Sequence, residues 1–342
     1  MKKKKLLYLF PTSIEHFGLK RKFEGQFSAL SKRYACQSFF IHSGRHFFSQ
    51  LWHLLIYEIK VLISILFVNK VYCRYNPKTV LSNVCMIGLS FFKPIYWEHN
   101  TKLDVELKLL NRYGEYCLNF ITFLVLRFSR IEHVCVTNEI LLYLKRTYLP
   151  GSKFLFVQNG YQRPAALSLD AYDAKVIDRI LLHKRSFQTI GIFVGGGFFW
   201  HGVDEMINSL LKKMPSLGIV VVGDYSLDSI HPNVLVVSKQ NISTIMTIYE
   251  YCDFGIGTFQ TGHLNLKESS NLKVREYLVN GLPVLNFKYD TASEIDSLRP
   301  YMFNIFEDED ALYKIINAKV NRADLMMLAE KELSWNKLMR VI

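Results

Sequence analysis

The chain has 342 residues, more than one ordinary hydrophobic core accommodates, so we expect two domains. Half of the residues are apolar and 14% are aromatic, which is enough to bury a substantial interior. The 42 basic residues outnumber the 30 acidic ones and give a formal net charge of +12. Such an excess favours a polyanion or an anionic membrane surface as a partner and carries no information about the fold.

Six cysteines lie scattered through apolar stretches without a Cys-x-x-Cys pair, which disfavours zinc and indicates buried, reduced thiols in a cytosolic protein. They are Cys36, Cys73, Cys85, Cys117, Cys135 and Cys252. The apolar run of residues 6–10 is too short for a signal peptide and lacks a cleavage site. The later runs 61–68 and 120–126 fall short of the ~20 residues that cross a bilayer. We therefore expect no membrane-spanning segment, whereas peripheral attachment stays open.

The first half of the chain alternates between strand and helix patterns. Strands are expected near residues 6–10, 37–42, 71–75, 95–99, 134–136 and 154–157. The first strand is followed by a loop with Gly18 and an amphipathic helix, which is the order of the phosphate-facing corner of a doubly wound domain. A single glycine in a loop is also often only a turn, so both interpretations of Gly18 stay open.

An apolar, aromatic-rich stretch at residues 47–67 predicts a helix or a pair of helices. The sequence favours an interpretation in which this stretch packs inside the first domain. In the alternative, its basic and aromatic face lies on a membrane surface.

The second half begins with a charged linker helix at residues 163–186 and a strand at residues 189–194. The strand ends in Gly195, Gly196 and Gly197, and consecutive glycines allow positive φ angles and a close backbone approach to a ligand. A helix from about residue 203 aims its amides at that loop. The pattern is not Gly-x-Gly-x-x-Gly with an acidic ribose partner, which disfavours a nicotinamide dinucleotide site. Further strands and helices alternate up to a last helix at residues 323–342, without repeats.

Residues 268–285 contain a polar loop, a short helix and a Gly-Leu-Pro turn into a buried strand. Leu272 faces a core at helical spacing, Glu276 lies on a flank, and Gly281 ends the helix in a left-handed cap. The start of such a helix attracts phosphate, and ionised glutamates beside it can accept hydrogen bonds from sugar hydroxyls. The alternative is a generic helix with solvated glutamates.

Glu268 and Glu276 stand eight positions apart before the Gly281-Leu-Pro-Val turn, and this arrangement resembles the nucleotide-sugar site of GT-B glycosyltransferases. The similarity is greatest to the retaining family 4 enzymes (glycosyl transferases group 1) of bacterial surface polysaccharide synthesis. The resemblance implies an α/β fold in which two Rossmann-like, doubly wound domains face each other across a cleft. It implies an N-terminal acceptor-side domain at residues 1–163, with helix 323–342 packing back on it, and a nucleotide-sugar domain at residues 164–322.

The resemblance also assigns roles to residues of the second domain. Glu276 is expected to bind the ribose hydroxyls and Glu268 the hydroxyls of the donor sugar, with the loop 269–271 as an alternative contact to the donor. The residues implied in donor binding are Gly18, Gly196, Gly197, His201, Ser270, Asn271, Leu272 and Glu276. Many relatives grip the diphosphate with an Arg and a Lys, but glycine and His201 stand at those positions here. The positive charge is therefore expected from Lys273 and Arg275.

In the first domain, the Arg-Tyr-x-Pro segment at Arg74 and the Glu-His-Asn segment at residues 98–100 match the family. The resemblance places Arg74, Glu98 and Asn100 on the acceptor side and His99 near the transferred sugar. A surface salt bridge for Arg74 and a purely structural hydrogen bond for His99 are the alternatives.

The implied enzyme is a metal-independent hexosyltransferase with His99, Glu268 and Lys273 at the reacting centre. No cofactor or metal ion is implied, because the nucleoside diphosphate sugar is the substrate. The implied acceptor is a glycan or lipid-linked intermediate of a bacterial cell-surface glycan, such as capsule or O-antigen. The expected location is the cytoplasm, with peripheral contact at the inner face of the plasma membrane.

Two other classes of function remain open. One is a non-catalytic protein of GT-B fold that binds a polyanion or a membrane, and the other is a GT-B sugar-nucleotide epimerase or phosphorylase. The basic residues are spread along the chain and are densest in residues 2–33, which favours a membrane over a nucleic acid as partner.

Overall fold

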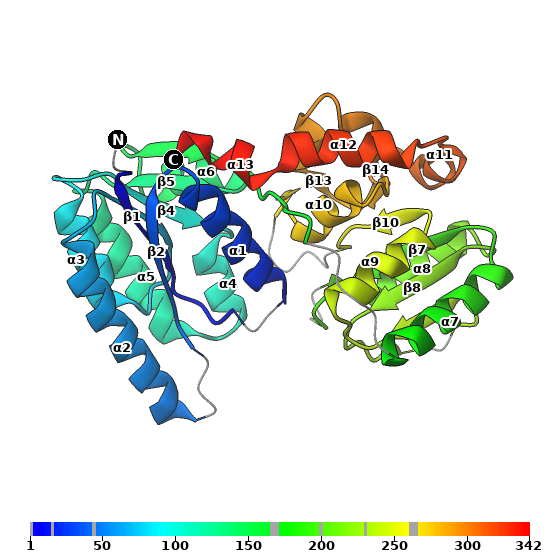
Figure 1. Ribbon diagram of the computed structural model, residues 1–342, viewed down its shortest axis with the longest axis horizontal. Helices are drawn as coiled ribbons and strands as arrows, with labels where there is room; N and C mark the ends of the chain where they lie inside the picture. Colours follow the sequence, from blue (N-terminus) through cyan, green and yellow to red (C-terminus); the bar gives the residue numbers. More distant parts are fainter. Residues whose placement is uncertain are drawn as a thin grey trace. The chain divides into compact units, whose positions relative to one another are not determined.

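A computed structural model describes residues 3–14, 17–42, 46–164, 171–197, 201–228, 231–259 and 266–342. The chain divides into two compact units: unit 1 comprises residues 1–160 and 335–342, and unit 2 comprises residues 161–334. Each unit is built on a six-stranded sheet whose strands pair in parallel, with helices between most of the consecutive strands (Figure 1). The predicted α/β fold with two doubly wound sheets is confirmed.

The sheet of unit 1 has the strand order β2-β1-β3-β4-β5-β6. Its strands are β1 (Lys5–Phe10), β2 (Ala35–Phe40), β3 (Lys70–Arg74), β4 (Ile95–His99), β5 (Glu132–Cys135) and β6 (Lys153–Phe156). The helices are α1 (Phe17–Ser31), α2 (Phe47–Ile65), α3 (Val80–Leu89), α4 (Leu103–Leu109), α5 (Tyr113–Leu126), α6 (Asn138–Thr147) and α13 (Trp335–Leu338), followed by a 3-10 turn at Met339–Val341. The strand order reverses between β1 and β3, and ligands of open α/β sheets bind at the carboxyl ends of strands at such a point.

The sheet of unit 2 has the order β14-β12-β10-β7-β8-β9 and reverses between β7 and β10. Its strands are β7 (Ile190–Val194), β8 (Gly218–Val222), β9 (Val234–Val237), β10 (Phe254–Ile256), β12 (Val284–Asn286) and β14 (Met302–Asn304), with a small sheet of β11 (Glu268–Ser269) and β13 (Tyr289–Asp290). The helices are α7 (Ala171–Ser186), α8 (Val203–Lys213), α9 (Ile242–Glu250), α10 (Leu272–Val279), α11 (Ala311–Asn317) and α12 (Arg322–Leu333), with 3-10 turns at Thr291–Glu294 and Arg299–Tyr301.

Both sheets are covered on their two faces, which explains why their central strands are continuous apolar runs. In unit 1, α2, α3, α5 and α6 contribute to the core on one face of the sheet, while the ring of Tyr8 on the other face stacks on Phe23 of α1. In unit 2, α7, α9, α10 and α12 share one core and α8 and α11 share another.

The C-terminal segment is divided between the two units at Ser334, whose extended ψ of 135° ends α12. Helix α12 belongs to unit 2, where Leu325 and Ala329 are fully buried in the core that includes α10. Trp335 packs on α1 in unit 1, directly over Gly25, where a Cβ atom would lie 2.2 Å from the indole Cδ1. Of the segment 323–342 that we expected on the first domain, residues 335–342 lie in unit 1 and residues 323–334 lie in unit 2.

The cysteines differ in part from the expectation of burial. All six are free thiols, but Cys117 is exposed and Cys36 and Cys85 are half-buried. Cys117 lies on α5, whose buried residues are Asn119, Phe123 and Leu126.

Candidate functional site

A glycine loop follows β7 at the point where the strand order of unit 2 reverses. Gly197 has a φ of +78°, and a Cβ atom there would lie 2.6 Å from the carbonyl oxygen of Asp224. A Cβ atom on Gly195 would lie 2.0 Å from the hydroxyl of Tyr225. Only glycine at positions 195 and 197 allows this loop to lie so close to the loop after β8. Gly196, which stands between these two glycines, is exposed. Residues 198–200 lie outside the described residues.

His201 follows the glycine loop as a neutral side chain. Its Nδ1 lies 2.7 Å from the hydroxyl of Tyr225, and its ring centroid lies 5.9 Å from that of Phe193. Burial, together with the charge of Lys273, lowers the pKa of His201 to about 3. At physiological pH this imidazole is therefore uncharged and brings no positive charge to the glycine loop. The following helix, α8, begins after Gly202, which has a φ of 59°.

Lys273, in the first turn of α10, places a buried amine against the ring of Phe193. Its Nζ lies 3.7 Å from the ring centroid of Phe193, has almost no exposed surface and finds no hydrogen-bond acceptor among the described residues. Burial lowers the pKa of Lys273 to about 7, against the opposing effect of Glu276. An amine in this position gains most from an anionic ligand, because the ligand would supply the missing charge and acceptors.

The polar loop before α10 is held in place by Asp290. This carboxylate accepts hydrogen bonds from Ser269 Oγ at 3.0 Å, from the Asn271 amide at 3.3 Å and from Ala292 N at 2.9 Å. It also forms an ion pair with Arg275, Nη1 to Oδ1 at 2.5 Å, and both side chains are fully buried. The prediction that Arg275 supplies charge to a diphosphate is therefore wrong, because its guanidinium is committed to Asp290 and Thr291.

The other predicted donor residues of this region lie on β11, the loop and α10. Ser270 is buried and accepts a hydrogen bond from Thr291 Oγ1 at 3.1 Å, and Asn271 Nδ2 lies 3.4 Å from Thr258 Oγ1 in the loop after β10. Leu272 and Glu268 are half-buried, whereas Glu276 is 8% exposed, one turn beyond Lys273 on the same helix.

Helix α10 is tied to the end of β7 next to the glycine loop. The amide of Val194 donates a 2.9 Å hydrogen bond to the hydroxyl of Tyr277, and Phe193 contacts both His201 and the amine of Lys273. The glycine loop and the start of α10 therefore adjoin each other in unit 2. Sequence reasoning missed Phe193, Tyr225 and Asp290, which shape this region without any local motif.

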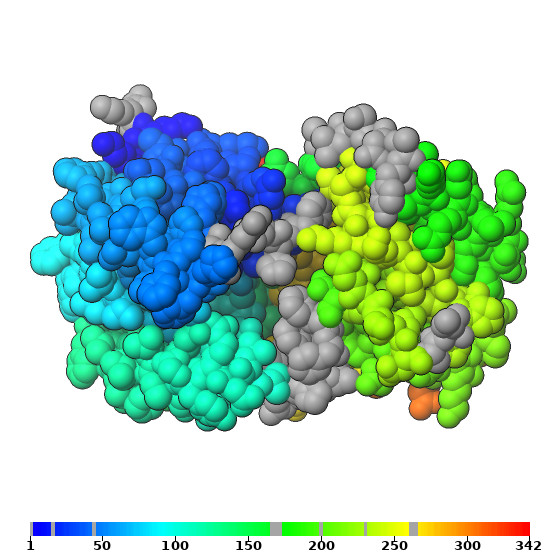
Figure 2. All heavy atoms as spheres, turned by 90° about the horizontal axis from the view of Figure 1, so that it is seen from below, coloured from blue at the N-terminus to red at the C-terminus, as the bar shows by residue number. Residues whose placement is uncertain are grey.

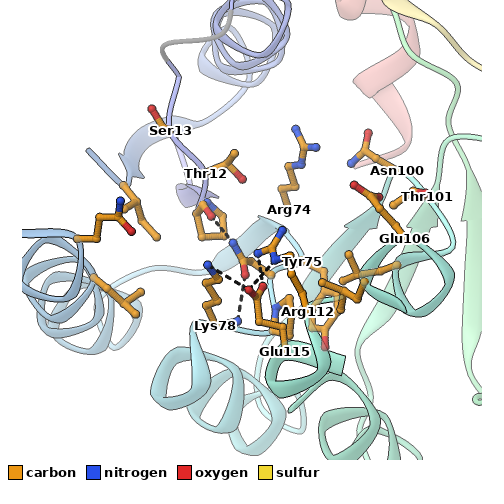
Figure 3. Close-up of a pocket in the computed structure, with 18 of the residues that line it drawn as sticks. Thr12, Ser13, Arg74, Tyr75, Lys78, Asn100, Thr101, Glu106, Arg112 and Glu115 are labelled. Carbon is orange, nitrogen blue, oxygen red and sulfur yellow. Dashed lines mark hydrogen bonds and ion pairs between the residues drawn. The ribbon is translucent and has the colours of Figure 1, made fainter. Parts of the chain in front are cut away.

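Unit 1 contains a cavity of about 630 Å³ at its own reversal point, between the ends of β1, β3 and β4. Figure 3 shows Arg74 at the end of β3, with Thr12, Asn100, Thr101 and Glu106 around the same space. Side chains of Phe47, Leu51, Leu54, Leu103 and Leu107 add apolar walls. Lys78 and Arg112 also line the cavity and both pair with Glu115, at 3.2 Å for the lysine.

Arg74 is a cation of this cavity with a buried donor that has no partner among the described residues. Its Nη1 is buried without a hydrogen-bond partner among the described residues, and its Cζ lies 5.0 Å from the ring centroid of Phe10. The alternative interpretation of Arg74, a surface salt bridge, is not supported, because Arg74 forms no salt bridge within the described ranges. Burial raises the pKa of Glu106, against the effect of Thr101 and Arg74.

Glu98 is the centre of a buried network within unit 1. Its carboxylate accepts hydrogen bonds from Gln26 Nε2 at 2.6 Å, Tyr72 Oη at 2.5 Å and Asn100 Nδ2 at 2.7 Å, and it pairs with Lys22 Nζ at 2.6 Å. Burial alone would raise the pKa of Glu98, but Lys22, Tyr72 and Arg74 outweigh it and hold the pKa at about 2. These four donors occupy the acceptor sites of both carboxylate oxygens, so Glu98 stabilises the fold and orients the side chain of Asn100.

His99 is buried beside a second histidine that the sequence analysis did not identify. Its Nε2 lies 3.0 Å from Nδ1 of His133, and only 4% of His99 is exposed. Burial lowers the pKa of His99 to about 3 although Glu98 opposes the shift, so the ring is neutral at physiological pH. Its contact with a transferred sugar stays a prediction. Gly18 was expected in the loop before the helix, but it lies in the first turn of α1, where it is exposed.

Solved structures resemble the whole chain. Sucrose-phosphate synthase from Thermosynechococcus elongatus has a TM-score of 0.64 to this chain at 8% sequence identity. The superposition covers 98% of this chain and 96% of the synthase chain. HepE from Anabaena, solved in complex with UDP and glucose, has a TM-score of 0.61 at 13% identity and covers 98% of both chains. The chain has the GT-B fold.

Other GT-B proteins are similar as well. A candidate UDP-N-acetylglucosamine 2-epimerase from Listeria monocytogenes has a TM-score of 0.52 at 12% identity, covering 98% of this chain and 93% of its own. No protein-family model and no curated protein sequence matches the chain. The similarity to GT-B proteins is therefore one of fold, and the residues of the site must carry any assignment of activity.

Proposed function

We propose that the protein is a glycosyltransferase that moves a hexosyl unit from a nucleoside diphosphate sugar to an acceptor hydroxyl, with retention of the anomeric configuration. The observation that carries this proposal is the buried amine of Lys273 beside the glycine loop of unit 2, which finds no hydrogen-bond acceptor among the described residues. The similar HepE structure, solved with UDP and glucose, supports a donor of this class.

The proposed donor site uses backbone amides and one cation. The diphosphate lies against residues 195–197 and the amino end of α10, where amide dipoles favour negative charge. Lys273 contributes the remaining charge without a metal ion. Glu276 binds the ribose, and Glu268 or the loop 269–271 contacts the sugar or the phosphates.

The reaction breaks the bond between the anomeric carbon and the diphosphate oxygen and leaves the electron pair on the diphosphate. The anomeric carbon then bonds to the acceptor oxygen, and the acceptor proton passes to a phosphate oxygen of the leaving group. Lys273 stabilises the charge that builds up on the diphosphate. His99 contacts the transferred sugar as a neutral imidazole.

The acceptor is proposed to bind in the cavity of unit 1. Arg74 has a buried Nη1 there without a hydrogen-bond partner among the described residues, so the cavity suits an acceptor that carries an anionic group as well as hydroxyls. An intermediate of a bacterial cell-surface glycan at the cytoplasmic side of the membrane has this chemistry.

A sugar-nucleotide epimerase is the second candidate, because one of the similar structures is described as such an enzyme. The test incubates the full chain with a set of nucleoside diphosphate sugars, with and without a bacterial lipid extract. A transferase releases nucleoside diphosphate in proportion to the glycosylated product and only when the extract is present. Formation of an isomeric nucleotide sugar without the extract would establish the epimerase instead.

A further inference from the structure

Three neighbouring helices of unit 1 expose large apolar side chains. Helix α3 packs against both α2 and α5, so the three helices form one continuous face. Figure 2 shows their blue, light-blue and teal atoms side by side. On α2 the exposed side chains follow helical spacing along its length and are 44–81% exposed: Phe48, Trp52, Leu55, Ile59 and Ile63.

The same face continues over the two other helices. The exposed apolar residues there are Val80, Leu81 and Val84 of α3, Phe91 and Phe92 after it, and Phe120, Ile121, Leu124, Val125 and Phe128 in or after α5. We call these residues and those of α2 the α2–α3–α5 surface. A water-facing helix normally carries polar residues on its outer side, so an apolar face this large marks a site of association.

The exposed charged side chains on and directly beside these helices are basic. The carboxylates of α2, α3 and α5 are Glu58, which is buried, and Glu115, which pairs with Lys78 and Arg112. Lys60, Arg127 and Arg130 are exposed on or beside the same helices. An apolar face fringed by basic residues complements a bilayer with anionic headgroups, whereas a protein partner would need no such excess.

Helix α2 belongs to the fold of unit 1, although it is the one helix in the described ranges that is long and apolar enough to cross a bilayer. Its inner side buries Tyr57, Val61 and Ile65 in the core. Glu58, in the middle of the helix, accepts hydrogen bonds from the amide and hydroxyl of Ser82 on α3, the former at 2.8 Å. Crossing a membrane would break these contacts and expose a carboxylate to lipid, so α2 fits a bilayer surface better.

We propose that the α2–α3–α5 surface docks on an anionic lipid bilayer. Phe47, Leu51 and Leu54 of α2 also line the cavity of unit 1, so docking brings that cavity to the membrane surface. If the proposed function holds, the acceptor then carries a lipid anchor and its headgroup enters the cavity beside Arg74. The docking itself does not depend on the proposed function.

The test measures binding of the full chain to phosphatidylcholine vesicles with and without about 30% phosphatidylglycerol, by flotation. The test variant is Trp52→Glu with Ile63→Glu. The matched control is Leu182→Glu with Met327→Glu, because these residues are as exposed (65% and 64%) but lie on α7 and α12 of unit 2. Thermal unfolding and binding of nucleoside diphosphate should be unchanged in both variants.

We expect binding to the anionic vesicles, weakened by high salt, that falls by at least about tenfold in the test variant and less than about twofold in the control. If the native protein bound neither kind of vesicle, the proposal would be overturned. It would also be overturned if the test variant bound the anionic vesicles as well as the native protein does. A dimer in light scattering that the test variant dissociates would overturn it too, because the face would then bind a second copy. Failure of vesicle binding with intact nucleotide binding would leave the proposed function standing.

Discussion

Replacing Lys273 by methionine should stabilise the unliganded protein and weaken donor binding. Methionine keeps the length of the side chain over Phe193 and removes the buried amine. Burial lowers the pKa of this amine from 10.5 to about 7. At about 1.4 kcal/mol for each pKa unit, this corresponds to at most about 5 kcal/mol, and we expect about 2–5 kcal/mol of stabilisation in Lys273→Met near pH 7.

The stabilisation should depend on pH in one direction. Between the folded pKa of about 7 and the unfolded pKa of 10.5, the unfolded chain binds more protons at this site, so the stability of the native protein rises with pH. The advantage of Lys273→Met is therefore complete below pH 7 and disappears as pH approaches 10.5. Urea unfolding at several pH values measures it, with Lys212→Met, an exposed lysine on α8, as the control.

The affinity for the donor should depend on pH in the opposite direction to the stability. The amine pairs with a diphosphate only when protonated, so above pH 7 the native protein must take up a proton when it binds nucleoside diphosphate, and its affinity falls by about tenfold per pH unit. Titration calorimetry in buffers of different ionisation enthalpy measures this proton directly. Lys273→Arg should bind without proton uptake, and Lys273→Met should bind about 100-fold more weakly. Equal affinities and equal proton uptake in Lys273→Met and the native protein would refute the reasoning.

Three further variants test separate parts of the site. Glu276→Ala should weaken binding of a nucleoside diphosphate sugar by about tenfold or more in calorimetry, with thermal unfolding little changed; an unaltered affinity would remove Glu276 from the site. Arg275→Met should cost about 3–5 kcal/mol in urea unfolding because it leaves the buried Asp290 unpaired, and a loss below about 1 kcal/mol would show that the pair is not structural. Arg74→Met should raise the KM for acceptor and leave donor affinity unchanged, whereas an unchanged KM would place the acceptor elsewhere.

The sequence predicted the elements of both sheets well because strands buried on two faces are continuous apolar runs. The short helix predicted before Gly281 is α10, and Gly281 has the left-handed φ of 75° expected of a helix cap. These features are local, so a short stretch of sequence contains the information that fixes them.

The failed prediction for Arg275 has a geometric cause. Residues two apart on an α-helix project about 200° apart, so Lys273 and Arg275 cannot face the same ligand. Lys273 reaches Phe193 and the glycine loop, and Arg275 points to Asp290 on the other side. The partner stands fifteen positions away on β13, and no motif links the two residues.

The apolar surface of unit 1 also required the structure. In the sequence, α2 has apolar residues on nearly all sides, and the favoured interpretation was burial. Only the packing of α2 against α3 shows that one stripe of the helix is buried and the opposite stripe is exposed. Likewise, three of the four donors on Glu98 come from α1 and β3, so its structural role is invisible in the Glu-His-Asn segment.

The central claim is that unit 2 holds a diphosphate between the glycine loop and the start of α10, and a crystal structure of the full chain with nucleoside diphosphate tests it most directly. The account predicts phosphate oxygens within hydrogen-bonding distance of Lys273 Nζ and of amides in residues 195–197, with the ribose at Glu276. A diphosphate bound away from Lys273, with that amine still unpaired, would contradict it.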